Sequence, residues 1–137
     1  MFMNRNLSLL GKYLEKPLTI VKCGARGDTT HPLIEAFKNT EFIGFEPDEK
    51  ECKQLNAKAS SNYRYFPYIV AHKNTISKLF ITKNPSCSSL LKPDTAFMSP
   101  FLKNPSELSI VKNLNLKTVS LDTFLPKIKV VNFDLLE

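Results

Sequence analysis

Two glycines and one glutamate are the residues whose types and spacing could do chemistry in this chain. Gly24 and Gly27 follow the apolar segment 18–23, and Glu46 ends a second segment, 41–46, about 20 residues further on. Glycine lets the backbone approach a ligand closely, and a carboxylate after the second strand can accept hydrogen bonds from both ribose hydroxyls. The layout predicts a site for a ligand that contains adenosine. The alternative is an ordinary turn, with Glu46 a solvated acid.

Arg26 discriminates among the adenosine ligands. Dinucleotide sites carry G-x-G-x-x-G, in which the second glycine admits the pyrophosphate. Here Arg26 stands at that second position, so a bulky side chain lies where a diphosphate would pass. S-adenosylmethionine has no phosphate and brings only a carboxylate to the helix N-terminus, where free amides can bind it. The substitution favours this methyl donor over NAD, and a dehydrogenase or epimerase on a similar sheet remains an alternative.

The elements that must position these residues alternate between strand and helix patterns. The expected strands are 18–23, 41–46, 63–71, 77–83, 108–121 and 130–135, and the expected helices are 7–16, one capped by Thr30, 49–58 and a short turn at 121–125. Asp48 and Glu51 form a capping box for helix 49–58, and 77–83 should pair antiparallel with a nearby strand. This order predicts an α/β fold of Rossmann-like type, a mostly parallel sheet with helices on both faces.

The segment 84–106 differs in composition from the rest of the chain. It contains four of the prolines together with several Ser and Asn residues. Such a composition predicts a long loop with little regular structure, and loops of this length are uncommon unless they are functional or disordered. The whole chain, 1–137, is expected to form a single domain.

Four phrases of the sequence carry a resemblance to a known family. They are Gly24-Ala-Arg-Gly27, Ile43-Gly-Phe-Glu-Pro-Asp48 with Glu51, Leu55 and Asn56, Asn84-Pro-Ser-Cys-Ser-Ser-Leu90, and Val119-Ser-Leu-Asp-Thr-Phe124. In this order they resemble the FkbM family of S-adenosylmethionine-dependent methyltransferases, over residues 18–137. The resemblance implies a class I methyltransferase fold and transfer of a methyl group to a hydroxyl on a sugar, lipid or natural product.

The resemblance also implies roles for single residues. The expected cofactor-binding residues are Gly24, Ala25, Arg26 and Gly27 for the methionine part, Glu46 with the adjoining Pro47 for the ribose, and His72 beside the adenine. No catalytic base is identified, because His31 is expected to cap a helix or lie at the surface. Ser86, Ser88 and Ser89 are open to two interpretations, contact with a ligand or turn formation.

Three departures from the family pattern leave a third interpretation open. Lys22 stands where the family carries an acid near the donor's amino group, and a lysine there would repel the ammonium and the sulfonium. The segment Ala71-His-Lys-Asn74 lacks the usual acid, and Asn132-Phe-Asp-Leu-Leu-Glu137 stops before the acid and glycine that usually follow. We therefore expect a truncated domain. A decayed, non-catalytic interaction module is the alternative. With either interpretation we expect a homo-oligomer that forms through an exposed sheet edge.

Composition limits the classes of partner. The 19 Lys and Arg exceed the 13 Asp and Glu, but they are scattered, which is not typical of a nucleic-acid-binding surface. No apolar run is long enough to span a membrane, and the three cysteines fit no metal-binding spacing. The sequence predicts a cytoplasmic protein that acts on a small-molecule or glycan acceptor, with no metal site, no nucleic acid and no membrane span.

Overall fold

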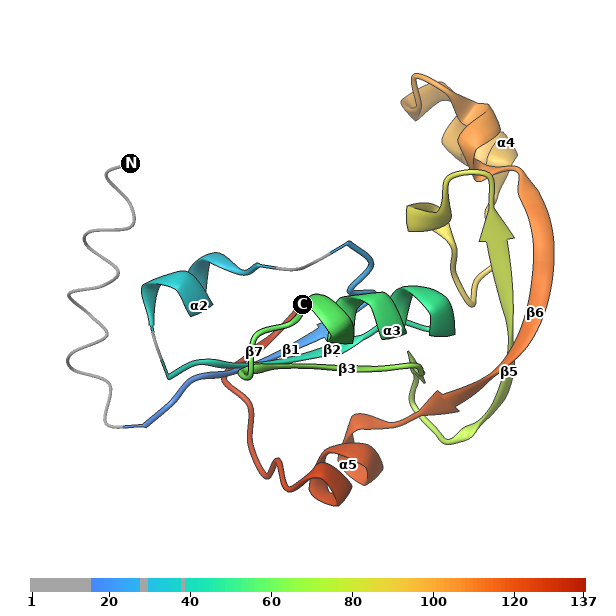
Figure 1. Ribbon diagram of the computed structural model, residues 1–137. Coiled ribbons are helices and arrows are strands. Elements are labelled where there is room, and N and C mark those ends of the chain that lie inside the picture. The colour runs from blue at the N-terminus through green and yellow to red at the C-terminus, as the bar shows by residue number, and fades with distance from the viewer. Residues whose placement is uncertain (1–15, 28–29, 38) are drawn as a thin grey trace.

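The computed structural model describes residues 16–27, 30–37 and 39–137. The expected helix at 7–16 lies outside these ranges except for its last position. A four-stranded parallel sheet forms the centre of the fold, in the order β3-β2-β1-β7 (Figure 1). Its strands are β1 (Thr19–Cys23), β2 (Glu41–Phe45), β3 (Tyr63–Phe66) and β7 (Leu135–Leu136). β7 is the fourth strand of this sheet along the chain, so the spatial order is third, second, first, fourth. This is the order of the first four strands of the Rossmann layout, in which the strand order reverses beside the first strand.

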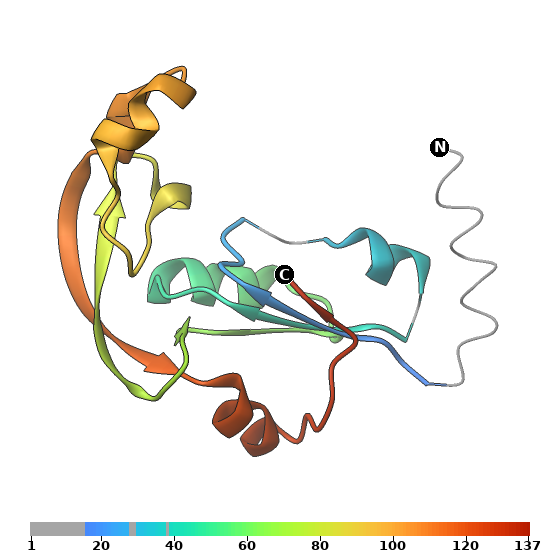
Figure 2. The same cartoon turned by 180° about the vertical axis from the view of Figure 1, so that it is seen from behind.

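Helices cover both faces of the parallel sheet, as predicted. α2 (Pro32–Ala36) and α3 (Glu49–Lys58) lie over one face, and α5 (Leu121–Phe124) with the turn η5 (Leu125–Ile128) lies over the other (Figures 1 and 2). Successive strand residues point to opposite faces. Ile20 and Phe42 therefore belong to the core under α2 and α3, whereas Val21 and Ile43 belong to the core over α5.

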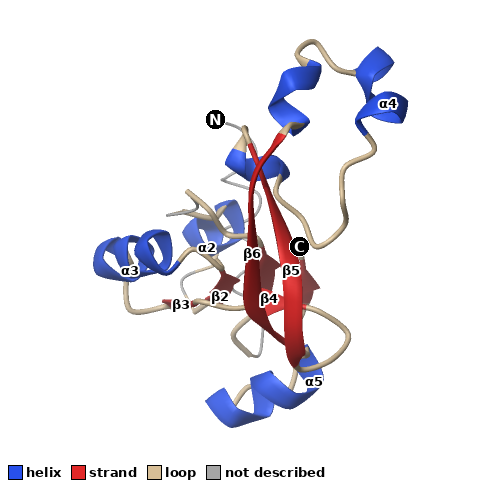
Figure 3. Ribbon diagram, turned by 90° about the vertical axis from the view of Figure 1, so that its right-hand side faces the viewer, coloured by secondary structure: helices blue, strands red, loops and turns tan. Residues whose placement is uncertain are grey.

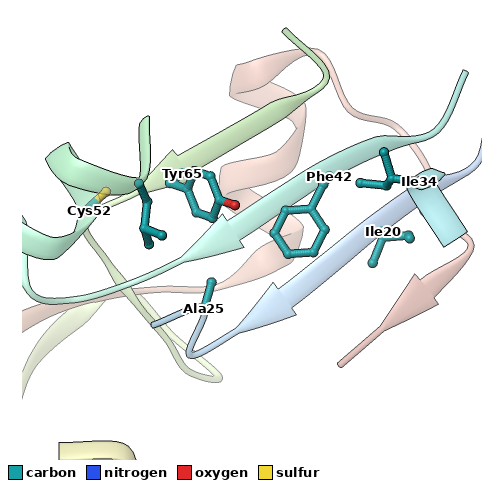
Figure 4. Close-up of a cluster of buried hydrophobic side chains, with 7 residues drawn as sticks. Ile20, Ala25, Ile34, Phe42, Cys52 and Tyr65 are labelled. Carbon is teal, nitrogen blue, oxygen red and sulfur yellow. The ribbon is translucent and has the colours of Figure 1, made fainter. Parts of the chain in front are cut away.

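The core under α2 and α3 holds the turn after β1 against the sheet (Figure 4). Phe42 is only 1% exposed, and its ring centroid lies 5.2–5.8 Å from the rings of Tyr63, Tyr65 and His31. Gly44 allows this close packing, because a Cβ atom there would lie 2.6 Å from Tyr65 Cδ1 and 2.9 Å from Ala25 Cβ. The absence of a side chain at residue 44 thus leaves the space that Ala25 and the Tyr65 ring occupy.

A second sheet, in the order β4-β6-β5, extends away from the first (Figures 1 and 3). β5 (Thr75–Thr82) and β6 (Ile110–Val119) form a long antiparallel hairpin, and β4 (Ile69–Val70) joins β6 in parallel. The antiparallel pairing expected for 77–83 is confirmed, and its partner is β6. The expected continuous strand at 63–71 is wrong, because β3 and β4 belong to different sheets. Pro67 separates them, and proline cannot donate a hydrogen bond to a strand ladder.

The segment 84–106 contains more regular structure than its composition predicts. It holds η2 (Pro85–Cys87), α4 (Thr95–Met98), η3 (Ser99–Phe101) and the start of η4 (Pro105–Leu108), close to the far end of the hairpin (Figure 3). Proline in the first turn fixes φ at a helical value, and the side chains of Asn84 and Asp94 accept backbone hydrogen bonds at two of the N-termini. The prolines therefore begin short helices here.

Two further boundaries differ from the predictions. His31, and not Thr30, caps α2, because its Nδ1 accepts a hydrogen bond from the amide of Leu33. The expected strand at 130–135 contributes only Leu135 to β7. Lys129 adopts a left-handed conformation and the amide of Val130 bonds to Leu125 O, so this part of the chain closes the turn η5 instead.

Among the described residues, no helix combines the length and the apolar character needed to cross a membrane.

Candidate functional site

The glycine turn lies at the carboxyl end of β1, beside the end of β2. Gly24 and Gly27 have φ angles of 83° and 75°, a left-handed conformation that glycine adopts without steric cost. The amides of Gly24 and Ala25 both donate to Phe45 O, at 2.9 and 3.0 Å. The end of β2 thus holds the first half of the turn by its backbone. In open α/β sheets, ligands bind outside the carboxyl ends of the strands, where the strand order reverses.

Glu46 is a buried carboxylate directly after β2, with 3% of the residue exposed. Its Oε1 accepts a hydrogen bond from the amide of Asp48 at 2.9 Å and lies 3.5 Å from Arg26 Nη2. Burial raises the pKa of Glu46, against the opposing effects of the Asp48 amide and the Arg26 charge. All of these contacts are made by Oε1, and no hydrogen bond from the described residues reaches Oε2. Glu46 therefore faces the glycine turn.

Arg26 extends from the turn toward the acids that follow β2. Its Nη2 donates to Asp48 Oδ2 at 2.9 Å, and its Nη1 lies 3.6 Å from Glu51 Oε2. The Glu51 amide and the Arg26 guanidinium both lower the pKa of Asp48. The structure thus places this guanidinium beside the carboxylate that is predicted to bind ribose.

The predicted capping box is half formed. Asp48 Oδ1 accepts hydrogen bonds from the amides of Lys50 and Glu51, at 3.0 and 3.1 Å, as the pattern requires. The reciprocal bond is replaced, because the Asp48 amide donates to Glu46 while the Glu51 carboxylate turns toward Arg26. The residue that starts α3 therefore also positions Glu46 and Arg26.

Lys22 and Glu137 form a second ionic group, where β1 lies beside β7. Lys22 Nζ lies 3.5 Å from Glu137 Oε2. His31 accepts the Leu33 amide at Nδ1, so its proton lies on Nε2, which donates to Glu137 Oε1 at 3.3 Å. The hydrogen bond from His31, together with the charge of Lys22, lowers the pKa of Glu137.

Sequence reasoning missed Glu137 as a member of the site. The available signal was an acid directly after a short apolar segment, the same pattern that identified Glu46. The pairing of β7 with β1 brings this acid to Lys22, because the Cys23 amide donates to Glu137 O at 2.8 Å. Lys22, whose charge is expected to repel the cofactor, thus lies next to the Glu137 carboxylate.

The structure brings the turn 24–27 close to Glu46 and Pro47. No hydrogen bond or ion pair links His72 to these residues. His72 is exposed, in the connection between β4 and β5. It makes no hydrogen bond or ion pair within the described part of the chain. The reason is the break at Pro67, after which the chain has left the parallel sheet.

The loop serines form turns. Ser88 Oγ accepts a hydrogen bond from the Thr82 amide at 3.2 Å, and Ser89 Oγ accepts one from the Leu91 amide at 3.1 Å. The Ser86 amide donates to Asn84 Oδ1. These contacts favour the turn interpretation over contact with a ligand. Within residues 16–27, 30–37 and 39–137, no cluster of three or more His, Cys, Asp or Glu side chains could hold a metal ion.

Comparison of the chain with models of protein families, with curated proteins and with solved structures found no match.

Proposed function

We propose that this chain is the S-adenosylmethionine-binding domain of a methyltransferase of the FkbM type, acting on a hydroxyl of a sugar, lipid or natural product. The observation that carries the proposal is the buried carboxylate of Glu46, which faces a glycine turn at the point where the strand order reverses. A ribose bound at such a point offers two hydroxyls to the carboxylate.

The nucleoside end of the cofactor fits the residues present. No hydrogen bond from the described residues reaches Glu46 Oε2, which can accept from a ribose hydroxyl. Arg26 does not need to leave, because its shorter contact is to Asp48, at 2.9 Å, while Glu46 lies 3.5 Å away. A ligand that binds the Glu46 carboxylate would leave Arg26 paired with Asp48 and Glu51.

The methionine end fits less closely. The amides of Gly24 and Ala25 are bonded to Phe45 O, whereas those of Arg26 and Gly27 donate to no described residue and are the ones we assign to the cofactor's carboxylate. Lys22 would repel the ammonium group, but the Glu137 carboxylate 3.5 Å from its Nζ offsets that charge. We therefore expect the nucleoside to supply most of the binding.

Isothermal titration with S-adenosylhomocysteine tests the proposal. We expect the wild-type chain to bind this product and Glu46→Gln to bind at least about tenfold more weakly, since charge-assisted hydrogen bonds are lost. Glu41→Gln is the matched control, because Glu41 lies at the other end of β2 and pairs with Arg64. Absence of heat with the wild type would overturn the proposal, and binding of NAD alone would indicate a dehydrogenase or epimerase.

A second candidate function is a non-catalytic interaction module. The specific observation in its favour is that both cations of the site, Arg26 and Lys22, are ion-paired with the chain's own acids. Among the described strands, β7 also pairs with β1 on one side only, and an unpaired strand edge promotes association. A dimer that forms with concentration in sedimentation, without affinity for S-adenosylhomocysteine, would support this function over the first.

A further inference from the structure

A cavity of about 640 Å³ lies between the base of the β5–β6 hairpin and α5, apart from the glycine turn. Its lining comes from β5, β6, the connections around them, and α5 with η5, which follow β6 directly in the chain (Figure 1). This volume is within the range of small-molecule sites, about 300–1,000 Å³. None of the lining residues belongs to the proposed cofactor site, so the inference is independent of the proposed function.

Charge in this cavity has one sign. Lys117, on β6, and Lys127, on η5, both line it, and no Asp or Glu does. Neither lysine forms an ion pair within the described part of the chain. Asp122 belongs to the same helix as two lining residues, yet it is not part of the lining. The electrostatic preference is therefore for an anion.

The apolar part of the lining suits a hydrophobic body on that anion. The rings of Tyr68 and Phe124 meet edge to face, with centroids 5.3 Å apart. Val119 lies beside them, and Ile76 contributes a side chain from a residue that is 67% exposed. An apolar residue at that exposure loses contact with water when a ligand covers it.

Three polar side chains of the lining, those of Asn74, Thr118 and Thr123, are already bonded to the protein. Asn74 donates to Thr123 Oγ1 at 2.9 Å and accepts from the Ser120 amide at 2.9 Å. Thr118 Oγ1 donates to Lys73 O at 2.8 Å. A neutral sugar, which is recognised through many hydrogen bonds, would find few groups to bind here. The two lysines, the apolar walls and the hydroxyls of Tyr68 and Thr75 remain for recognition.

We propose that this cavity binds a small organic anion with an aromatic or aliphatic body, such as an aromatic carboxylate or sulfonate. The two lysines hold the acidic group, and Tyr68, Phe124, Val119 and Ile76 cover the body.

Fluorescence titration with anilinonaphthalene sulfonate tests this proposal, with uncharged phenylnaphthylamine as the matched probe. We expect the sulfonate to bind the wild type more tightly than the neutral probe, and the difference to shrink at high salt. The double variant Lys117→Gln/Lys127→Gln should bind the sulfonate about fivefold more weakly, with little change for the neutral probe. Lys78→Gln/Lys112→Gln, on the same hairpin but outside the lining, should behave as the wild type.

The location of binding is tested separately by amide chemical shifts. The sulfonate should shift the amides of Asn74 and Thr123, and Ile76→Ser should weaken both probes, since that exposed side chain is removed without loss of core packing. The exposed Phe97 and Phe101 of the hairpin end offer a competing apolar surface. Shifts confined to that end, or equal affinities of the double variant and the wild type, would overturn the proposal.

Discussion

The parallel sheet and the hairpin use the same residue types in opposite ways. At the carboxyl end of the sheet, Arg26 and Lys22 lie against acids, over a core of buried rings. On the hairpin and beside its base, Lys117 and Lys127 have no acid partner among the described residues, and Phe97 is 66% exposed. In the first region a ligand competes with contacts that hold the chain together. In the second, a ligand would meet two lysines without an acid partner among the described residues, and apolar walls that also pack against the core.

The largest expected effect is a difference in stability between aromatic substitutions in the two regions. Phe42→Ala should lower the free energy of unfolding by about 3–5 kcal/mol, because it leaves a cavity among three rings. Phe97→Ala should change it by less than about 0.5 kcal/mol, since an exposed ring contributes little to the fold. Urea unfolding of both variants measures the difference. Equal losses would show that the hairpin end is as much a part of the core as the sheet.

The charged residues offer the second comparison. Arg26→Met should destabilise the chain because it leaves Glu46 buried without its cation. A fully buried broken pair costs about 3–5 kcal/mol. Since the Arg26 side chain is 35% exposed, we expect a smaller loss of about 1–2 kcal/mol. Lys117→Met, which breaks no ion pair among the described residues, should change stability by less than about 0.5 kcal/mol. An equal loss in the two variants, again by urea unfolding, would contradict the distinction.

The pH dependence of stability sharpens the same comparison. Burial raises the pKa of Glu46 above its ordinary value, so the folded chain holds this proton more tightly than the unfolded chain. Stability contributed by Glu46 should therefore fall as the pH rises through the interval between its unfolded and folded pKa values. Glu46→Gln removes that fall. The stability of the variant relative to the wild type should thus increase from about pH 4 to pH 7.

Asp48 acts in the opposite direction. The Glu51 amide and Arg26 lower its pKa, so its contribution to stability is present above its ordinary pKa and is lost as the pH falls toward the folded value. Unfolding curves of Asp48→Asn below about pH 4 should therefore converge with those of the wild type. Divergence there, or a Glu46→Gln difference that decreases with pH, would contradict the assigned causes.

The smallest expected effect concerns Lys22. Lys22→Gln should strengthen binding of S-adenosylmethionine by about threefold relative to S-adenosylhomocysteine, because only the former carries a sulfonium charge and the repulsion is partly screened. Titration with both molecules measures the ratio. A ratio equal to that of the wild type would mean that Lys22 does not act on the bound donor.

The residues that sequence reasoning predicted well are those whose neighbours are close in the chain. β1, β2, α3 and the separate strands β5 and β6 follow from local patterns of apolar residues and from the cap at Asp48. The pairing of β5 with β6 was not identified. The break of the third strand was not predicted, although Pro67 stands at it. The partners of Arg26 and Lys22 could not be read from the sequence, because they depend on the register of β2 and β7 against β1.

The cavity beside α5 could not be predicted at all from the sequence. Tyr68, Ile76, Lys117 and Lys127 are far apart in the chain and form no motif. They meet only because β4 and β5 both pair with β6, which α5 follows. Sites of this kind depend on how two sheets and a helix come together, and single-sequence patterns carry no information on that arrangement.

The most direct test of the central proposal is whether Glu46 binds a ribose hydroxyl. Calorimetry should compare S-adenosylhomocysteine with its analogue that lacks the ribose 2′-hydroxyl, on the wild type and on Glu46→Gln. We predict that loss of the hydroxyl weakens binding to the wild type by about tenfold and leaves binding to the variant unchanged. Equal weakening in both proteins would contradict the proposal, because the hydroxyl would then be bound by another group.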